Sequence, residues 1–181
     1  PYLHPLVIEI VRRHLALAGR LPQAVDVACG TGQSTTALLP LAERGGVDPS
    51  AAMLAVAPRP PGVRYAVGTA EAIPIASGAA DLLSVALAFH WFDRARFLAE
   101  ARRTLHPGGW LVIYNNGFGG TMRENDAFAA WNRDVYLPRF ATPPRQSAPL
   151  TDEEATAAGF RIALREQYRN DVTCSTGEFA T

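Results

Sequence analysis

Apolar positions in the first 115 residues occur in two patterns that alternate along the chain. Short apolar or alternating runs indicate buried strands, and apolar residues three or four positions apart indicate amphipathic helices. The first pattern predicts strands at 24–28, 45–48, 63–67, 82–87 and 110–114. The second predicts helices at 4–17, 32–43, 50–57 and 93–105. Strands that alternate with helices of this length indicate right-handed crossovers, so we expect an α/β fold. Its sheet would be Rossmann-like, doubly wound and mostly parallel, with helices on both faces.

The pattern changes after residue 115. A glycine-rich stretch is followed by a predicted helix at 123–136, with Phe128 and Trp131 expected to face inward. Residues 138–149 contain four prolines and predict a surface connection. We interpret residues 115–150 as an insertion on the substrate side of a cofactor-binding core formed by residues 1–114, because loops of this kind often carry substrate contacts.

The last part of the chain predicts one helix and one strand. Thr151 and Glu154 have the spacing of a capping box, which opens a short helix that Gly159 ends. Residues 160–168 predict a sixth strand. The chain starts without a methionine, and a second capping-box pattern stands just before its end. We therefore expect a single domain over residues 1–181 that is truncated at both termini, with residues 151–181 incomplete.

Composition narrows the class of partner. With 181 residues, of which 48% are hydrophobic, the chain can bury a substantial core. Seventeen basic and seventeen acidic side chains give a formal net charge of zero, which argues against a nucleic-acid partner. The sequence has no apolar run of membrane-spanning length, and Cys29 and Cys174 have no metal-ligand or disulfide pattern. We expect a cytoplasmic protein that binds a small molecule and no metal, and the oligomeric state stays open.

Residues 25–32 carry the strongest functional signal. An apolar run ends in two glycines separated by one residue and passes directly into a predicted helix. A strand, tight turn and helix start in this order present backbone N–H groups to a ligand at the edge of a parallel sheet. Asp26 lies inside the apolar run, and a buried carboxylate is costly unless it is paired. A ligand with a cationic group would suit this position.

Two ligand classes use such a turn. A dinucleotide site needs a third glycine where this chain has Thr35. S-adenosylmethionine has no phosphate and carries a sulfonium and an ammonium, for which Asp26 could supply the opposite charge. Asp48 stands 18 residues after Gly30 and could accept the hydroxyls of a ribose, which both ligands contain. The alternative is that Asp48 caps the helix that follows, and Met53 could lie against an adenine or in the core.

Four segments in order resemble one family. Asp-Val-Ala-Cys-Gly-Thr-Gly at 26–32, Gly-Val-Asp-Pro-Ser-Ala-Ala-Met-Leu at 46–54, Gly-Thr-Ala-Glu-Ala-Ile-Pro at 68–74 and Leu-His-Pro-Gly-Gly-Trp-Leu at 105–111 resemble class I S-adenosylmethionine-dependent methyltransferases. Ala-Phe-His-Trp-Phe-Asp at 88–93 resembles the small-molecule branch that includes trans-aconitate methyltransferase-like proteins. The resemblance covers about residues 1–115 well and the rest loosely.

The resemblance implies roles for individual positions. It places the methionyl group by the glycine turn, the ribose by Asp48, the adenine edge by residues 69–71 and the ammonium at the end of the fourth strand. Ala28 departs from the pattern, since many members have a glycine there. The complete set of implied cofactor-binding residues is Tyr2, Asp26, Ala28, Gly30, Gly32, Asp48, Pro49, Met53, Thr69, Ala70, Glu71, Ala86, Leu87 and Trp91.

Methyl transfer from a sulfonium is an in-line displacement, for which the enzyme mainly aligns the groups and excludes water. A base is needed only if the acceptor must lose a proton. His90 is the candidate because it follows the fourth strand at the ligand-binding edge of the sheet, although it could simply belong to an aromatic cluster. Asn115 and Asn116 could contact the substrate. Whether oxygen, nitrogen or carbon is methylated stays open.

Two other functions compete with this interpretation. One is an oxidoreductase that binds NAD on a similar sheet, which Thr35 and the adenine-edge segment disfavour. The other is a methyltransferase-like interaction module that binds the cofactor without turnover. Because Asp26, Gly30, Gly32 and Asp48 are all present, we expect cofactor binding to be retained.

Overall fold

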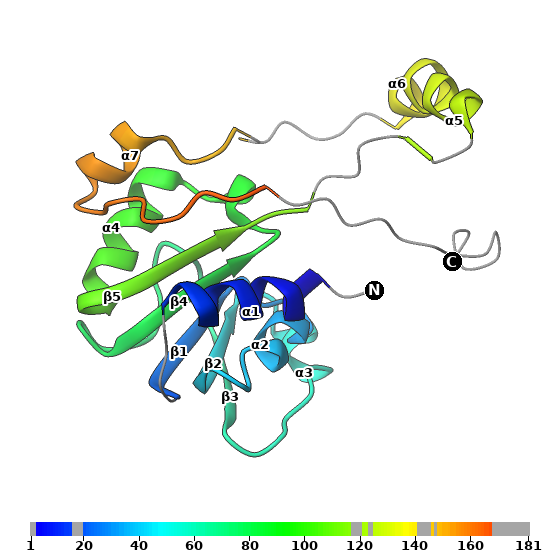
Figure 1. The fold of residues 1–181 in the computed structure, drawn as a ribbon. Helices are drawn as coiled ribbons and strands as arrows, with labels where there is room; N and C mark the ends of the chain where they lie inside the picture. The colour runs from blue at the N-terminus through cyan, green and yellow to red at the C-terminus, as the bar shows by residue number, and fades with distance from the viewer. Residues whose placement is uncertain are drawn as a thin grey trace.

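The computed structural model describes residues 3–15, 20–116, 121–122, 125–140, 146 and 148–167 (Figure 1). Its described strands form one five-stranded parallel sheet in the order β3-β2-β1-β4-β5. All five strands predicted in the first 115 residues are confirmed, and several extend beyond the predicted bounds. The strands are β1 (Leu21–Val27), β2 (Ala42–Asp48), β3 (Val63–Val67), β4 (Ala80–Ala86) and β5 (Leu105–Tyr114).

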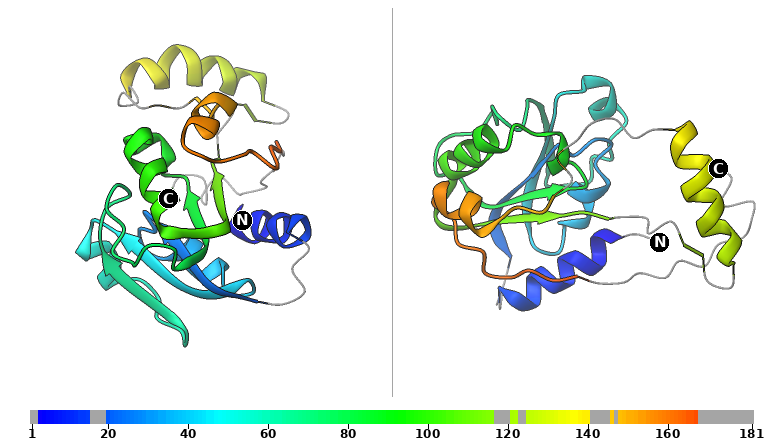
Figure 2. Two further views of the ribbon diagram at one scale, coloured as in Figure 1. Left: turned by 90° about the vertical axis from the view of Figure 1, so that its left-hand side faces the viewer. Right: turned by 90° about the horizontal axis from the view of Figure 1, so that it is seen from above.

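Helices cover both faces of this sheet. Ala24 of β1 and its neighbour Leu82 of β4 pack into one core together with α1. The next residues along these strands, Val25 and Leu83, belong to a second core together with α4. Figure 2 shows α1 and α4 on opposite sides of the strands. The chain therefore has the doubly wound α/β fold that the sequence predicts. The helices of this part are α1 (Leu3–His14), α2 (Gln33–Ala37), α3 (Ala51–Ala55) and α4 (Arg94–Thr104).

The predicted helix at 32–43 is wrong in its second half. Helix α2 ends at Ala37, and β2 begins already at Ala42. Pro40 explains the early end, because a proline disfavours the helical conformation of the residue before it. Leu38 and Leu41 have helical spacing but are buried from a turn, each only 1% exposed.

The predicted sixth strand is also wrong. Residues 160–167 pair with no strand, although Phe160 packs partly against the core. The segment runs along β5 in Figure 1, where it is orange to red. A cavity of about 850 Å³ lies between this segment, α1 and β5. Because that space separates the segment from the edge of β5, a hydrogen-bonded ladder cannot form between them.

The insertion contains a helix that stands away from the sheet in every view (Figures 1 and 2). It extends past the predicted end at residue 136, so that Pro138 belongs to helix and not to the predicted connection. The rings of Phe128 and Trp131 lie 5.7 Å apart, and Trp131 is 46% exposed. The expected inward orientation is therefore wrong, since these rings pack along their own helix. The segments of this helix are α5 (Asp126–Trp131), a π-helical turn η2 (Asn132–Tyr136) and α6 (Leu137–Arg139).

The capping box at Thr151 is confirmed. The Thr151 hydroxyl accepts a hydrogen bond from the Glu154 N–H at 3.1 Å, and the Glu154 carboxylate accepts one from the Thr151 N–H at 2.8 Å. The helix that it opens is α7 (Asp152–Ala157), and Gly159 follows it in the left-handed conformation, with φ of 78°.

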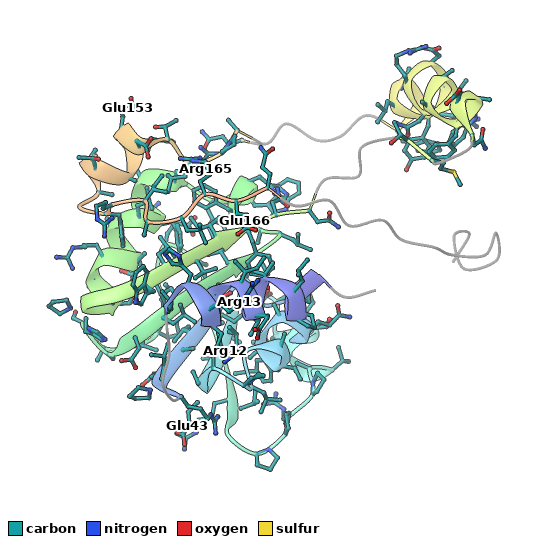
Figure 3. All side chains as sticks on the ribbon, viewed as in Figure 1. Arg12, Arg13, Glu43, Glu153, Arg165 and Glu166 are labelled. Carbon is teal, nitrogen blue, oxygen red and sulfur yellow. The ribbon has the colours of Figure 1, made fainter. Side chains whose placement is uncertain are left out.

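The charged side chains of α1 lie on its outer surface. Arg12 and Arg13 project from α1 (Figure 3) and form ion pairs with Glu9 on the same helix. The three side chains are about half exposed or more, so these ion pairs lie on a solvated face of the helix. Among the residues that the structure describes, no helix has the length and apolar character needed to span a membrane.

Candidate functional site

A cavity of about 250 Å³ opens at the carboxyl ends of β1 and β4. The order of the strands reverses between these two neighbours, and ligands of doubly wound folds bind at this switch point. Five predicted cofactor-binding residues line the cavity: Ala28, Gly30, Met53, Ala86 and Leu87. The other lining residues are His4, Cys29, Thr31, Gln33 and Ser34. The larger cavity beside β5 lies away from the glycine turn.

Both strands end at this cavity in a strained residue. Ala28 and Leu87 have φ of 57° and 58°, and among the described residues no other non-glycine residue has a positive φ. This conformation costs an L-residue about 1–2 kcal/mol. Neighbouring strands hold both turns: the Cys29 N–H donates to the Val47 carbonyl, and the Leu87 N–H donates to the Tyr114 carbonyl. Such strain is found at ligand sites, where the surrounding structure fixes the backbone.

Replacing Ala28 by glycine is expected to raise the free energy of unfolding by up to about 1 kcal/mol, because glycine adopts a positive φ without steric cost. Urea denaturation measures the change. Ala24→Gly is the matched control, since Ala24 lies buried within the same strand, and there glycine is expected to destabilise the fold. Destabilisation by both substitutions would show that the turn at Ala28 stores no strain.

Asp48 fixes the glycine turn. The Gly30 N–H donates to one carboxylate oxygen of Asp48, and the Ser50 N–H donates to the other, both at 2.8 Å. Each oxygen retains the capacity for a further hydrogen bond. The hydroxyl of Ser50, and not Asp48, caps α3 by accepting from the Met53 N–H at 3.3 Å. Both oxygens of Asp48 are thus held by backbone N–H groups and keep acceptor capacity beside the glycine turn.

Asp26 is fully buried beneath the turn, with half of its carboxylate unpaired. Its Oδ2 atom accepts hydrogen bonds from the hydroxyls of Ser34 at 2.6 Å and Thr35 at 2.7 Å. Thr35 stands where a dinucleotide site needs its third glycine, and here its hydroxyl helps to hold the Asp26 carboxylate. Oδ1 has no hydrogen-bond partner in the described part of the chain, and neither has Oγ of Ser84, the residue opposite Asp26 in β4.

Burial raises the pKa of Asp26 to about 6, and the nearby Asp48 adds to this increase, while the two hydroxyls act in the opposite direction. An unpaired buried carboxylate oxygen is costly, so the site favours a cation or a hydrogen-bond donor nearby. Burial also raises the pKa of the Cys29 thiol to about 12. A thiol that stays protonated is a poor nucleophile, so Cys29 lines the cavity without being a reactive cysteine.

The segment predicted to contact adenine follows β3 and is connected to Asp48. The Gly68 N–H donates to the Asp48 carbonyl at 3.2 Å. The carboxylate of Glu71 accepts a hydrogen bond from the Asp93 N–H at 3.1 Å, and Ala70 is buried. Thr69, Ala70 and Glu71 thus follow a glycine that is bonded to the backbone of Asp48, and they lie outside the lining of the cavity.

His90 and Trp91 follow β4 in a short 3-10 turn, η1 (Phe89–Trp91). Their ring centroids are 4.8 Å apart, and Trp91 is 58% exposed. His90 borders the larger cavity and not the smaller one. Tyr2 lies outside the described residues. The predicted residues that do not line the smaller cavity are Asp26, Gly32, Asp48, Pro49, Thr69, Ala70, Glu71, His90 and Trp91.

Sequence reasoning did not identify the other lining residues, His4 among them, as part of the site, and it also missed Arg94. His4 of α1 lines the cavity, where its Nδ1 atom lies 2.8 Å from the hydroxyl of Tyr114, and burial lowers its pKa. Arg94 donates to the carbonyls of Gln146 and Ala148, which secures the end of the insertion next to the site. A cation in the first turn of a helix is unfavourable, so the position of Arg94 at the start of α4 could have indicated an outside partner.

Comparison with known proteins agrees with this geometry. Residues 25–113 match a family described as Methyltransferase domain. The chain is 43% identical over 148 residues to an uncharacterized methyltransferase of Mycobacterium tuberculosis, covering 77% of this chain and 56% of the relative. It is 40% identical over 97 residues to the trans-aconitate 2-methyltransferase of Deinococcus radiodurans, covering 50% of this chain and 36% of the relative.

Among solved structures, a proposed type II methyltransferase from Anaeromyxobacter dehalogenans superimposes with a TM-score of 0.64 at 31% identity. The match covers 77% of this chain and 58% of that one. The chain spans about half the length of the first curated relatives, with 43% of one and 56% of the next.

Proposed function

Because this chain belongs to the class I S-adenosylmethionine-dependent methyltransferase family, we propose that it transfers the methyl group of S-adenosylmethionine to a small-molecule acceptor. The observation that carries the proposal is the arrangement of Asp26 and Asp48 around the glycine turn. One carboxylate has an unpaired buried oxygen at the switch point, and the other has two oxygens held by backbone N–H groups. A ligand with an ammonium at one end and a ribose in the middle would supply a cation to the first carboxylate and hydroxyl donors to the second.

The remaining residues suit the other parts of this cofactor. Ala86 and Leu87 end β4 and would offer carbonyls to the ammonium, while Asp48 would accept the ribose hydroxyls. Met53 lies against the turn, with its sulfur 3.7 Å from the position of a Cβ atom on Gly30. Residues 69–71 would face the adenine edge. Family resemblance adds Tyr2, Gly32, Pro49 and Trp91 to the cofactor-binding set.

When bound, S-adenosylmethionine supplies an electrophilic methyl group on its sulfonium. The chain's own task is to align an acceptor with that group and to exclude water, which is a proximity effect. His90 is the proposed general base for an acceptor that must lose a proton, because it follows β4 at the edge of the sheet where ligands bind.

The insertion at 115–150 is the proposed substrate side of the domain, with residues 1–114 as the cofactor-binding core. It leaves the sheet where β5 ends, beside Asn115 and Asn116. It returns at Gln146, whose N–H donates to the His90 carbonyl at 3.2 Å. Both ends of the insertion are therefore attached at the edge that carries the site. A similar trans-aconitate methyltransferase supports a small-molecule acceptor.

Calorimetric titration with S-adenosylhomocysteine, and with NAD in parallel, tests the proposed cofactor. Micromolar binding of S-adenosylhomocysteine alone supports the proposal and justifies a screen of small acids and phenols as methyl acceptors. Binding of NAD alone would contradict it and favour an oxidoreductase. Binding of the homocysteine compound without turnover of any acceptor would favour an interaction module.

His90→Gln is expected to lower turnover of an identified acceptor by about 100-fold, the usual contribution of a general base, at unchanged affinity for S-adenosylhomocysteine. His106→Gln is the control, since His106 stands at the start of β5, away from the site, and pairs with Asp81 at 3.0 Å. Normal turnover by the His90 variant would exclude His90 as the base.

A further inference from the structure

The loop that joins β3 to β4 is attached to the end of α4 by two charged side chains. The Ile73 N–H donates to Oε1 of Glu100 at 2.7 Å. The Arg103 guanidinium donates to the carbonyls of Ile73 and Ile75, both at 3.0 Å, and to the hydroxyl of Ser77 at 3.2 Å. Residues 73–79 contain no helix or strand, so their backbone groups depend on partners of this kind.

Glu100 and Arg103 also hold each other. Two nitrogens of the guanidinium donate to the two carboxylate oxygens, each at 2.7 Å. Paired, planar contacts of this kind are stronger and more directional than a single ion pair. The guanidinium lowers the pKa of Glu100, which keeps the carboxylate ionised as the acceptor for the Ile73 N–H. Glu100 is only 13% exposed, which limits screening by solvent.

The same helix holds both ends of the loop. At the start of α4, the Asp93 N–H donates to the Glu71 carboxylate. At its end, the Arg103 carbonyl accepts from the Gly78 N–H at 2.9 Å. Helix α4 itself is fixed to the sheet by Phe97, Leu98 and Ala101, all of which are buried in the core. The position of the loop is therefore set by a helix that belongs to the core.

We infer that Glu100 and Arg103 are positioning residues for adenine recognition, an inference that rests on the proposed function. Residues 69–71 would recognise the adenine edge by backbone groups, and such groups discriminate only when their positions are fixed before the ligand arrives. Neither Glu100 nor Arg103 lines the cavity, so they act through the loop.

The test uses two ligands that differ only at the purine edge: S-adenosylhomocysteine and S-inosylhomocysteine, which has a carbonyl in place of the exocyclic amine. The measured quantity is the ratio of their dissociation constants. Arg103→Met is expected to reduce the preference for the adenine compound at least fivefold, mainly by weakening its binding. Arg103→Lys keeps the charge but loses the paired contact, so it is expected to restore only part of the preference.

Arg102→Met is the matched control. It removes the same charge from the neighbouring position of α4, where no hydrogen bond or ion pair is found among the described residues, and it is expected to keep the ratio within twofold. Arg103→Met with an unchanged ratio would overturn the inference, even if its melting temperature fell. Failure of the wild-type chain to bind S-adenosylhomocysteine would instead overturn the proposed function.

Discussion

Asp48→Ala is expected to lower the affinity for S-adenosylhomocysteine by about 100-fold or more. Hydrogen bonds to a charged group contribute about 1.5–3 kcal/mol each, and about 3 kcal/mol in total corresponds to roughly 100-fold in affinity. The substitution also removes the acceptor for the Gly30 and Ser50 N–H groups, so the glycine turn loses its support. Isothermal titration calorimetry measures the affinity directly.

Asp81→Ala controls for a general loss of structure. The Asp81 carboxylate also accepts a backbone N–H, that of Gln23 at 2.7 Å, but it lies near the start of β4, at the opposite edge of the sheet. Its removal is expected to lower the melting temperature while the affinity stays within twofold. Unchanged affinity in the Asp48 variant would remove Asp48 from the site.

The strands of the sheet could be predicted because the signal for each of them lies in a few consecutive residues. Strands covered by helices on both faces are apolar over consecutive residues, as at Leu82, Leu83 and Val85, which are all fully buried. Carboxylates that interrupt or end such strands then stand out, and Asp26 and Asp48 were identified in this way. Their placement at one edge follows from the parallel arrangement alone.

Features that depend on distant contacts could not be predicted. His4 is part of the cavity only because α1 packs against the end of β5, where Tyr114 is its partner. The alternation of residues 160–167 is typical of a strand, but a strand also requires a free edge within hydrogen-bonding reach. The left-handed conformation of Ala28 is imposed by neighbouring strands, and no local signal in an alanine reveals it.

The stability of the fold is expected to contain a contribution from Asp26 that decreases as the pH rises from about 4 to about 6. The pKa of the folded state, about 6, lies above the ordinary value of 3.8. In this window the folded chain holds a proton that the unfolded chain has released, so raising the pH favours unfolding. The difference corresponds to about 3 kcal/mol across the window.

Asp26→Asn isolates this contribution, because asparagine has nearly the same shape and does not titrate. The free energy of unfolding of both proteins is measured by urea denaturation between pH 4 and 7. The difference between the two free energies is expected to change by about 3 kcal/mol across this range, since the other carboxylates titrate alike in both proteins. A constant difference between the two free energies of unfolding would show that Asp26 does not titrate in this pH range.

The same proton couples Asp26 to the cofactor. An ammonium near Oδ1 favours the ionised carboxylate, so binding of S-adenosylhomocysteine below pH 6 must release the proton. The affinity of the wild-type chain is therefore expected to fall by up to tenfold per pH unit below 6. The Asp26→Asn variant should bind more weakly and show no such dependence. If both proteins lost affinity equally with falling pH, the ammonium would not be paired with Asp26, and the cavity would orient its ligand in another way.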